Sequence, residues 1–149
     1  MIVQPCDPGC APAQELAAEL SAALAAITGA SGQASFSADD ARSARSLFVV
    51  AKDDSGALLG CGALRLLGPD VGEIKRMYAR PGTRGVGAAL LLHLEREAQG
   101  FGYLELRLET RRVNARAVAF YLRRGYAEIP NYGKYAGRAD AVCLGKRLA

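Results

Sequence analysis

The chain predicts a single α/β domain of the α+β type over residues 1–149, with a central sheet of about six to seven strands flanked by helices. Short runs with strand patterning alternate with longer runs at helical spacing along the 149 residues. Half of the residues (50%) are hydrophobic, which is enough for one core. Because no internal repeat or linker interrupts this order, no second domain is expected.

The chain opens with a predicted strand and helix. Residues 2–4 are a short strand, and residues 12–27 repeat Leu and Ile at intervals of three or four, which predicts an amphipathic helix. Residues 28–40 are rich in small and polar residues and predict a loop. Ser37 is placed to cap a short second helix at the end of that loop.

The middle of the chain predicts three strands and a helix. Residues 46–53 and 57–67 read as two strands joined by a tight turn, which makes a hairpin. Residues 71–80 predict a third strand. Residues 84–99 repeat apolar positions at helical spacing, and Gly100 is a suitable stop for that helix.

The last third predicts a strand, a helix and two further strands. Residues 103–111 alternate between apolar and charged side chains, as in a half-buried strand. The apolar face of that strand is expected to carry Leu104, Leu106 and Leu108. Residues 114–125 have an Asn cap and a glycine stop around an amphipathic pattern. Residues 126–129 and 140–148 are the last strands expected, with a loop over 129–140 between them.

Composition argues against several functional classes. No apolar run approaches the roughly 20 residues of a membrane span, and the first residues lack the basic and apolar regions of a signal peptide. A soluble, cytoplasmic protein with no membrane partner is therefore expected. The net charge of +4 comes from 19 basic and 15 acidic residues, without a basic run or nucleic-acid motif. An anionic ligand fits this balance, and no nucleic-acid partner is predicted.

The cysteines and the histidine give no sign of a metal site. The four cysteines are Cys6, Cys10, Cys61 and Cys143. Two of them lie inside apolar strand-like runs, where Cys usually behaves as a small hydrophobic residue. We expect neither a disulfide framework nor a metal centre. His93, the only histidine, is expected to be a packed or surface residue of its helix.

Two glycines at the start of the 84–99 helix suggest a phosphate-binding site. A helix start leaves several N–H groups without acceptors at the positive end of the helix dipole, and such an end binds phosphate. Gly85 and Gly87 keep side chains away from these groups, and Arg84 adds a positive charge. On glycine spacing alone, a glycine turn that binds no ligand is the favoured interpretation. The P-loop motif is absent, and so is the third glycine of the dinucleotide motif.

Two segments together resemble a known family. R-x-x-G-x-A at residues 84–89 follows the strand EIKRMYA, and N-x-x-A-x-x-F-Y-x-x-x-G-Y occupies residues 114–126. This combination resembles the GNAT superfamily of acetyl-CoA-dependent N-acetyltransferases. The resemblance implies a mixed central sheet splayed open between the strand ending near Ala79 and the strand over 103–111. In such proteins the pantetheine arm of the cofactor lies in this gap.

The resemblance also implies a cofactor site for acetyl-CoA and no metal. Met77, Tyr78 and Ala79 would offer backbone groups to the pantetheine arm, and Asn114 matches an asparagine near that arm. The residues implied around the pyrophosphate are Arg84, Gly85, Val86, Gly87, Ala88, Ala89 and Leu90.

Acetyl transfer to an amine needs a base and an acid, because the amine, with a pKa near 10, must lose a proton and the thiolate must gain one. Glu73 and Glu109 match the positions of bases in related enzymes, and they are left as alternatives or joint partners through water. Tyr121 matches the tyrosine beside the sulfur, and the Met77 N–H would meet the oxyanion. The alternative for either glutamate is a solvated strand residue or an ion-pair partner of Arg76 or Arg107. The alternative for Tyr121 is a helix residue whose ring packs in the core.

The pocket for the acceptor amine is expected in the loop that precedes the last strand. Tyr132 and Tyr135, in the loop over 129–140, are expected to line the acceptor pocket, and Lys134 and Arg138 could attract a carboxylate; an ordinary surface loop is the alternative. The favoured function is N-acetylation of a small-molecule amine or amino acid. Acetylation of a protein lysine or N-terminus, or non-catalytic acetyl-CoA binding, remain alternatives. A homodimer is compatible with the resemblance, since dimers are common in that family.

Overall fold

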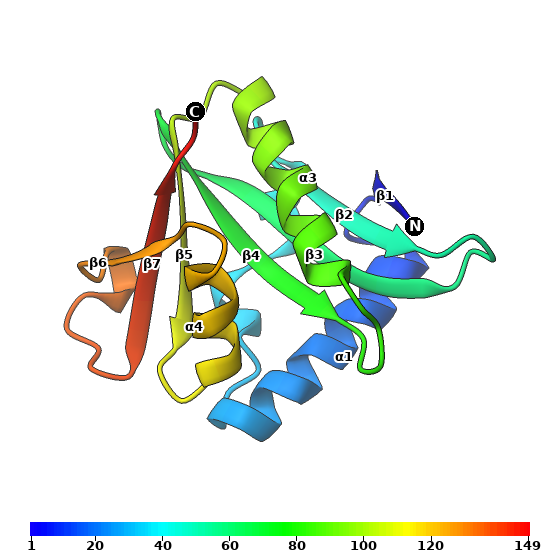
Figure 1. Cartoon of the computed structure of the whole chain (residues 1–149), viewed down its shortest axis with the longest axis horizontal. Helices are drawn as coiled ribbons and strands as arrows, with labels where there is room; N and C mark the ends of the chain where they lie inside the picture. The colour runs from blue at the N-terminus through cyan, green and yellow to red at the C-terminus, as the bar shows by residue number, and fades with distance from the viewer.

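The computed structural model describes residues 1–149 apart from the side chain of Ser35. Seven strands form one sheet in the order β1-β2-β3-β4-β5-β7-β6 (Figure 1). The strands are β1 (Ile2–Pro5), β2 (Leu47–Lys52), β3 (Leu58–Gly68), β4 (Val71–Ala79), β5 (Glu105–Arg111), β6 (Ala127–Ile129) and β7 (Ala141–Arg147). The helices are α1 (Ala11–Thr28), α2 (Ala38–Arg42), α3 (Val86–Gly100) and α4 (Ala115–Leu122), with single 3-10 turns η1 (Gln33–Ser35) and η2 (Gly133–Tyr135). The predicted α/β fold is confirmed.

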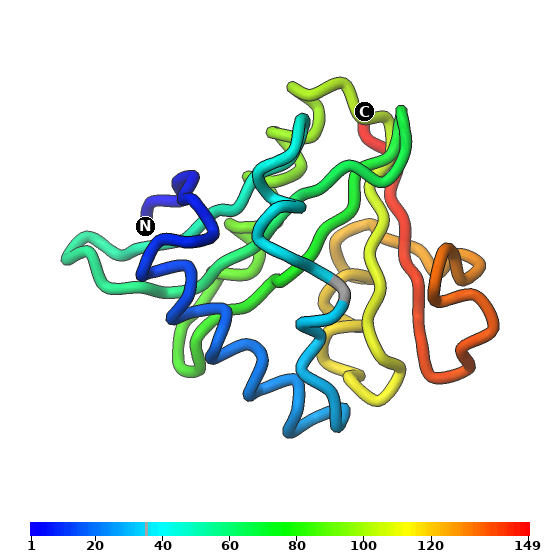
Figure 2. Tube along the Cα trace, turned by 180° about the vertical axis from the view of Figure 1, so that it is seen from behind, coloured from blue at the N-terminus to red at the C-terminus, as the bar shows by residue number. Residues whose placement is uncertain are grey.

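Helices cover both faces of the sheet. α3 and α4 lie on one face (Figure 1), and α1 with the segment that leads through α2 lies on the other (Figure 2). α3 contacts β3 and β4, and α4 contacts β5. The leucines predicted on one face of α3, including Leu90 and Leu94, are fully buried against Leu64 and Leu106 of the sheet. On the other face, Leu16 of α1 is equally buried.

The sheet is splayed between its fourth and fifth strands. β4 and β5 run parallel but pair only from Val71 opposite Glu105 to Glu73 opposite Arg107, and beyond this point they diverge (Figure 1). The other neighbouring strands are antiparallel. The backbone groups of β4 that face the gap therefore have no strand partner over its second half.

A β-bulge lies in the diverging half of β4. Cys61 pairs with Tyr78 and Ala63 with Lys75, so Arg76 and Met77 together oppose Gly62. Arg76 has φ +54, a conformation that costs energy for a residue with a side chain. Three hydrogen bonds hold its guanidinium group in compensation, to Ala17 O, Ser21 Oγ and Ser31 O. Because a bulge bends its strand, it contributes to the divergence from β5.

Local sequence signals explain the predicted turn and short helix. In the hairpin between β2 and β3, Asp53 Oδ1 accepts hydrogen bonds from the N–H groups of Ser55 and Ala57. Gly56, with φ +85, completes the turn. At the start of α2, Asp40 Oδ2 accepts the Ser37 N–H at 2.8 Å, so the predicted helix start is confirmed, although α2 is only five residues long.

One predicted strand begins later than its pattern suggests. Leu106 and Leu108 of β5 are buried, but Leu104 lies before the strand and is 49% exposed. The N–H groups of Leu104 and Glu105 both donate to Asp70 O, which turns the chain before regular pairing begins. The prediction that Leu104 shares the buried face was wrong for this reason.

The sequence predicted no disulfide framework, and it did not predict the disulfide that Cys6 and Cys10 form. Cys6 and Cys10 form a disulfide, while Cys61 and Cys143 are free and buried as predicted. The Cys10 N–H donates to Asp7 O, so the chain folds back on itself immediately before α1 and brings the two cysteines together. Two cysteines separated by four positions can thus form a disulfide without a wider disulfide framework.

Candidate active site

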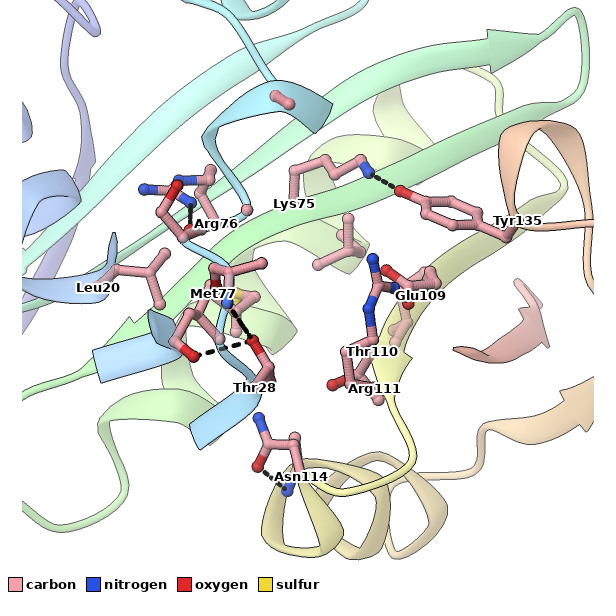
Figure 3. A pocket seen from close by; sticks show the side chains of 18 of the residues that line it. Leu20, Thr28, Lys75, Arg76, Met77, Glu109, Thr110, Arg111, Asn114 and Tyr135 are labelled. Carbon is pink, nitrogen blue, oxygen red and sulfur yellow. Dashed lines mark hydrogen bonds and ion pairs between the residues drawn. The ribbon is translucent and has the colours of Figure 1, made fainter. Parts of the chain in front are cut away.

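A cavity of about 410 Å³ lies between the diverging ends of β4 and β5, and we call it the central cavity. Its walls come from the end of α1, the loop that follows α1, both strands, α4 and η2. Residues predicted from distant parts of the sequence meet here (Figure 3). The predicted site residues that line it are Met77, Glu109, Asn114, Tyr121 and Tyr135.

The backbone of β4 supplies polar groups to this cavity at alternate residues. The Arg80 N–H donates to Leu59 O at 2.8 Å, and the Tyr78 carbonyl lies directly against Gly60 of β3. Since backbone groups of a strand alternate in direction, those of Met77 and Ala79 face the gap. The backbone of Tyr78 faces β3 instead, and its phenol donates to Glu19 Oε1 at 3.0 Å.

The glycine segment shapes the start of α3. Gly85 is the residue before the helix, with φ +69, and it provides no side-chain cap. The N–H groups of the first helical turn therefore lack intrahelical acceptors. A Cβ at Gly85 would meet no atom within 4 Å, whereas one at Gly87 would lie 3.1 Å from the Phe120 ring. An anion can thus approach the exposed N–H groups, and Arg84 is exposed beside them.

Asn114 joins β5 to α4 at the opposite side of the cavity. Its Oδ1 accepts the Ala117 N–H at 3.4 Å, which confirms the predicted helix cap. The remaining amide nitrogen points away from the helix toward the cavity (Figure 3). Asn114 therefore stabilises α4 and presents a hydrogen-bond donor to the gap between the strands.

Tyr121 lies on α4 with its ring in the core. It is 7% exposed and makes edge-to-face contacts with Phe120 and Tyr126, at centroid distances of 5.0 and 5.7 Å. Its side chain lines the central cavity. Burial raises the pKa of Tyr121 above its ordinary value. The phenol therefore stays protonated near neutral pH and can donate a proton.

The two glutamates lie in different places. Glu109 of β5 lines the central cavity, and its Oε2 accepts a hydrogen bond from Arg111. Glu73 of β4 is 1% exposed and does not line that cavity. The alternative partners expected for these carboxylates were wrong, because Arg76 binds backbone and hydroxyl oxygens and Arg107 binds Glu105.

Glu73 is the centre of a buried polar cluster. Its Oε1 accepts from Arg65 Nε at 2.8 Å, and its Oε2 accepts from the Tyr132 hydroxyl at 2.5 Å. Lys75 Nζ lies 3.6 Å from the same Oε2 and donates to the Tyr135 hydroxyl at 2.6 Å. Burial raises the pKa of Tyr132 and lowers the pKa of Lys75. Both oxygens of Glu73 are therefore committed to neighbouring groups.

A second cavity of about 470 Å³ lies beyond this cluster, between α2, β3 and η2. Glu73 and Tyr132 line this second cavity, whereas Tyr135 and Lys134 line both cavities. Of the two tyrosines predicted for the acceptor pocket, only Tyr135 therefore reaches the central cavity. Tyr132 packs against Tyr135 in an edge-to-face contact, with 5.7 Å between the ring centroids.

Comparison with known proteins decides the family. The family model described as Acetyltransferase (GNAT) family matches residues 14–126, about three quarters of the chain. The chain belongs to the GNAT family of acetyltransferases. The GNAT resemblance of residues 84–89 and 114–126 is thereby confirmed.

Individual relatives agree with this assignment. An IAA acetyltransferase of Azospirillum brasilense is 38% identical over 104 residues, which cover 68% of this chain and 67% of that protein. A solved structure from Klebsiella pneumoniae, named as an acyl-CoA N-acyltransferase, has a TM-score of 0.83 at 26% identity and covers 99% of this chain and 97% of its own. The PaiA N-acetyltransferase of Thermoplasma acidophilum, solved with coenzyme A, has a TM-score of 0.58 at 28% identity, covering 68% of this chain and 60% of its own.

Several lining residues of this GNAT domain were not singled out from sequence. Leu24 and Thr28 at the end of α1 form a wall of the central cavity, and nothing in their helical pattern distinguishes them from ordinary core residues. Lys75 could have been found from the sequence. It stands two residues after Glu73, so the two side chains share one face of the strand. A buried strand with opposite charges at that spacing predicts an internal ion pair.

Other groups lie away from both cavities. His93 on α3 is partly buried beside Glu97, with Nε2 3.7 Å from Oε1, in agreement with its predicted non-catalytic place. Across the described residues, no set of three or more His, Cys, Asp or Glu side chains is positioned to hold a metal ion. None of the helices is both long enough and apolar enough to cross a bilayer.

Proposed function

We propose that this GNAT protein transfers the acetyl group of acetyl-CoA directly to a primary amine of a small molecule or an amino acid. The observation that supports this most is the central cavity itself, which is lined by Met77, Glu109 and Tyr121 together. A base, an acid and a backbone donor around one space are what direct transfer requires.

The donor site is proposed at the gap and the helix start. GNAT acetyltransferases use acetyl-CoA, and the PaiA relative was solved with coenzyme A. The pyrophosphate would bind the free N–H groups from Gly85 to Ala88, with Arg84 adding charge and Ala89 and Leu90 completing the turn beside it. The pantetheine arm would lie against the backbone groups of Met77 and Ala79, opposite Asn114. The orientation of Tyr78 toward β3 does not favour a backbone contact from that residue.

Glu109 is the better candidate for the base. An amine with a pKa of about 10 must be deprotonated at a cost of about 4 kcal/mol at pH 7, so a carboxylate in contact with the amine or its water matters. Glu109 lines the cavity and keeps Oε1 available, while Arg111 holds Oε2. Glu73 is buried with both oxygens engaged by Arg65 and Tyr132, so its role is to position those residues.

The remaining steps follow from the groups around the thioester. The amine nitrogen forms a bond to the acetyl carbon while its proton passes to Glu109, directly or through water. The Met77 N–H would stabilise the negative carbonyl oxygen of the tetrahedral intermediate. When the carbon–sulfur bond breaks, the Tyr121 hydroxyl would protonate the leaving thiolate, and its raised pKa keeps that proton available.

The size of the cavity supports a small acceptor. About 410 Å³ is toward the lower end of the range for sites that bind small molecules, and part of it must hold the acetyl end of the cofactor. Loop residues after α1 and the η2 turn close the side opposite α4. This volume favours a compact amine over an extended protein chain.

A direct assay tests the proposed function. The purified protein is incubated with acetyl-CoA and panels of amines, amino acids, lysine peptides and N-terminal peptides, and thiol release and acetylated product are measured. We expect product with small amines or amino acids, and a large loss of turnover in the Glu109→Gln control. Product from peptides alone would support protein acetylation. Cofactor binding without any acetylated acceptor would support a non-catalytic module and contradict the proposal.

A further inference from the structure

The acceptor end of the site carries more positive than negative charge. The cations that line either cavity are Arg65, Lys75, Arg76, Arg111, Lys134 and Arg138. The carboxylates that line the cavities or pair with these cations are Asp40, Glu73, Glu109 and Asp140. Two cations are thus not neutralised by a carboxylate, and Figure 3 shows several of these groups around one space.

Most of these cations already have committed partners. Arg65 and Lys75 share Glu73, and Arg65 also lies 3.4 Å from Asp40. Arg111 binds Glu109, while Arg76 donates to backbone carbonyls and a serine hydroxyl rather than to a carboxylate. Arg138 forms an ion pair with Asp140, with 3.0 Å between its guanidinium nitrogen and the carboxylate oxygen. Their donors are therefore occupied before any acceptor binds.

Lys134 differs from the other cations. It is exposed on η2, lines both cavities, and lies with Nζ 5.7 Å from the centre of the Tyr135 ring. In the part of the chain that the structure describes, no carboxylate reaches ion-pair distance of its ammonium group. Desolvation, followed by the nearby charges of Lys75 and Arg65, lowers its pKa. Among the charges that act on Lys134, Glu73 opposes the three cations Lys75, Arg65 and Arg111, so a bound anion would stabilise its charged form.

We propose that the acceptor is an amine that also carries an anionic group, a carboxylate or a phosphate, and that Lys134 binds this group. The inference rests on the proposed function and narrows its substrate class. An acceptor whose only charge is its ammonium group is repelled by the uncompensated cations as it enters. A zwitterion pairs its anion with Lys134 and directs its amine toward Glu109 in the adjoining central cavity.

Matched acceptors test this inference. Each amino acid in a panel is compared with its decarboxylated amine, such as phenylalanine with phenethylamine and lysine with cadaverine. O-phosphoethanolamine, β-alanine and ethanolamine separate a phosphate from a carboxylate. We expect the anionic member of a pair to have at least roughly tenfold higher kcat/KM, in the range of a charge-assisted hydrogen bond. The pair with the larger ratio identifies which anion the site takes.

Variants of Lys134 connect the preference to this residue. Lys134→Met should raise the KM of the anionic acceptor about tenfold while keeping its kcat and the KM of acetyl-CoA. The KM of the neutral-tailed amine should fall or stay the same, because one repelling cation is removed. Lys134→Arg should retain most of the preference, and Lys52→Met on β2 serves as a control for loss of a lysine elsewhere.

Equal or better turnover of the decarboxylated amines would overturn the inference and leave the proposed function intact. So would an unchanged preference in Lys134→Met. If neither member of any pair is acetylated although the cofactor binds, the proposed function itself fails, and the inference fails with it.

Discussion

At the scale of single residues, Tyr121 combines a buried ring with a place in the lining of the central cavity. Tyr121→Phe keeps the ring contacts with Phe120 and Tyr126, so cofactor binding and folding should be retained. Turnover should fall roughly ten- to thousand-fold, the range for a lost proton donor. Steady-state kinetics with acetyl-CoA checks this. Tyr103→Phe, whose hydroxyl donates to Arg45 O at 2.8 Å, is the matched control.

The pH dependence of this variant has a defined sign. Because burial raises the Tyr121 pKa above its ordinary value of about 10, the phenol stays protonated from about pH 6 to 9. The ratio of wild-type to Tyr121→Phe rates should therefore be constant over that range. Equal rates would remove Tyr121 from the mechanism, and a ratio that declines toward pH 9 would show a phenol that titrates too early.

The choice between the two glutamates shows the limit of residue-level prediction. Both stand on strands that border the gap, and both were predicted from their positions alone. The two glutamates differ in their tertiary contacts. Arg65 and Tyr132 bind Glu73 from other elements, whereas Glu109 lines the central cavity. Sequence spacing fixes which face of a strand a residue occupies, but not which side chains arrive from elsewhere.

At the scale of elements, the start of α3 is the feature that we propose to bind the phosphates of the cofactor. Gly87→Glu would place a negative side chain beside the unpaired N–H groups and against the Phe120 ring, 3.1 Å from the new Cβ. We expect at least a roughly hundredfold loss of affinity for CoA, measured by calorimetry, since charge repulsion and lost N–H contacts act together.

The same helix provides the control for this change. Gly100 ends α3, and a Cβ there would meet nothing within 4 Å. Gly100→Glu adds the same side chain at the far end of the helix and should leave CoA affinity within about threefold, because the effect of a helix end is confined to its own turn. Unchanged affinity in Gly87→Glu would contradict a phosphate site at this helix.

At the scale of the whole molecule, periodicity was enough to predict the order of strands and helices and the turn at Asp53, because these depend on neighbours in sequence. The bulge at Arg76 and the enclosure of the cavity by the segment after α1 were not predicted. Both depend on distant partners, such as Ala17 O and Ser31 O for the Arg76 side chain. The Cys6–Cys10 disulfide was not predicted either, because it depends on the fold of the chain between the two residues, where the Cys10 N–H donates to Asp7 O.

The splayed sheet predicts that bound CoA stabilises the folded protein. β4 and β5 pair only up to Glu73 and Arg107, so the gap beyond them separates the two parts of the sheet. CoA in that gap would contact both strands and the start of α3 at once. At a concentration one hundred times its Kd, binding should add about 2.7 kcal/mol to the free energy of unfolding. For a chain of this size that corresponds to a rise in Tm of about 5–10 °C.

Hydrogen exchange distinguishes a ligand in the gap from one on the surface. With CoA bound, exchange should slow in residues 74–79 and 108–111 together, because the amides of Met77 and Ala79 gain acceptors and the facing strand becomes less exposed. Exchange in residues 47–52 of β2 should not change beyond the global stabilisation, and Gly87→Glu should lose most of the effect at the same CoA concentration. Protection confined to residues 74–79, with none in residues 108–111, would place the cofactor on β4 alone and contradict binding in the gap.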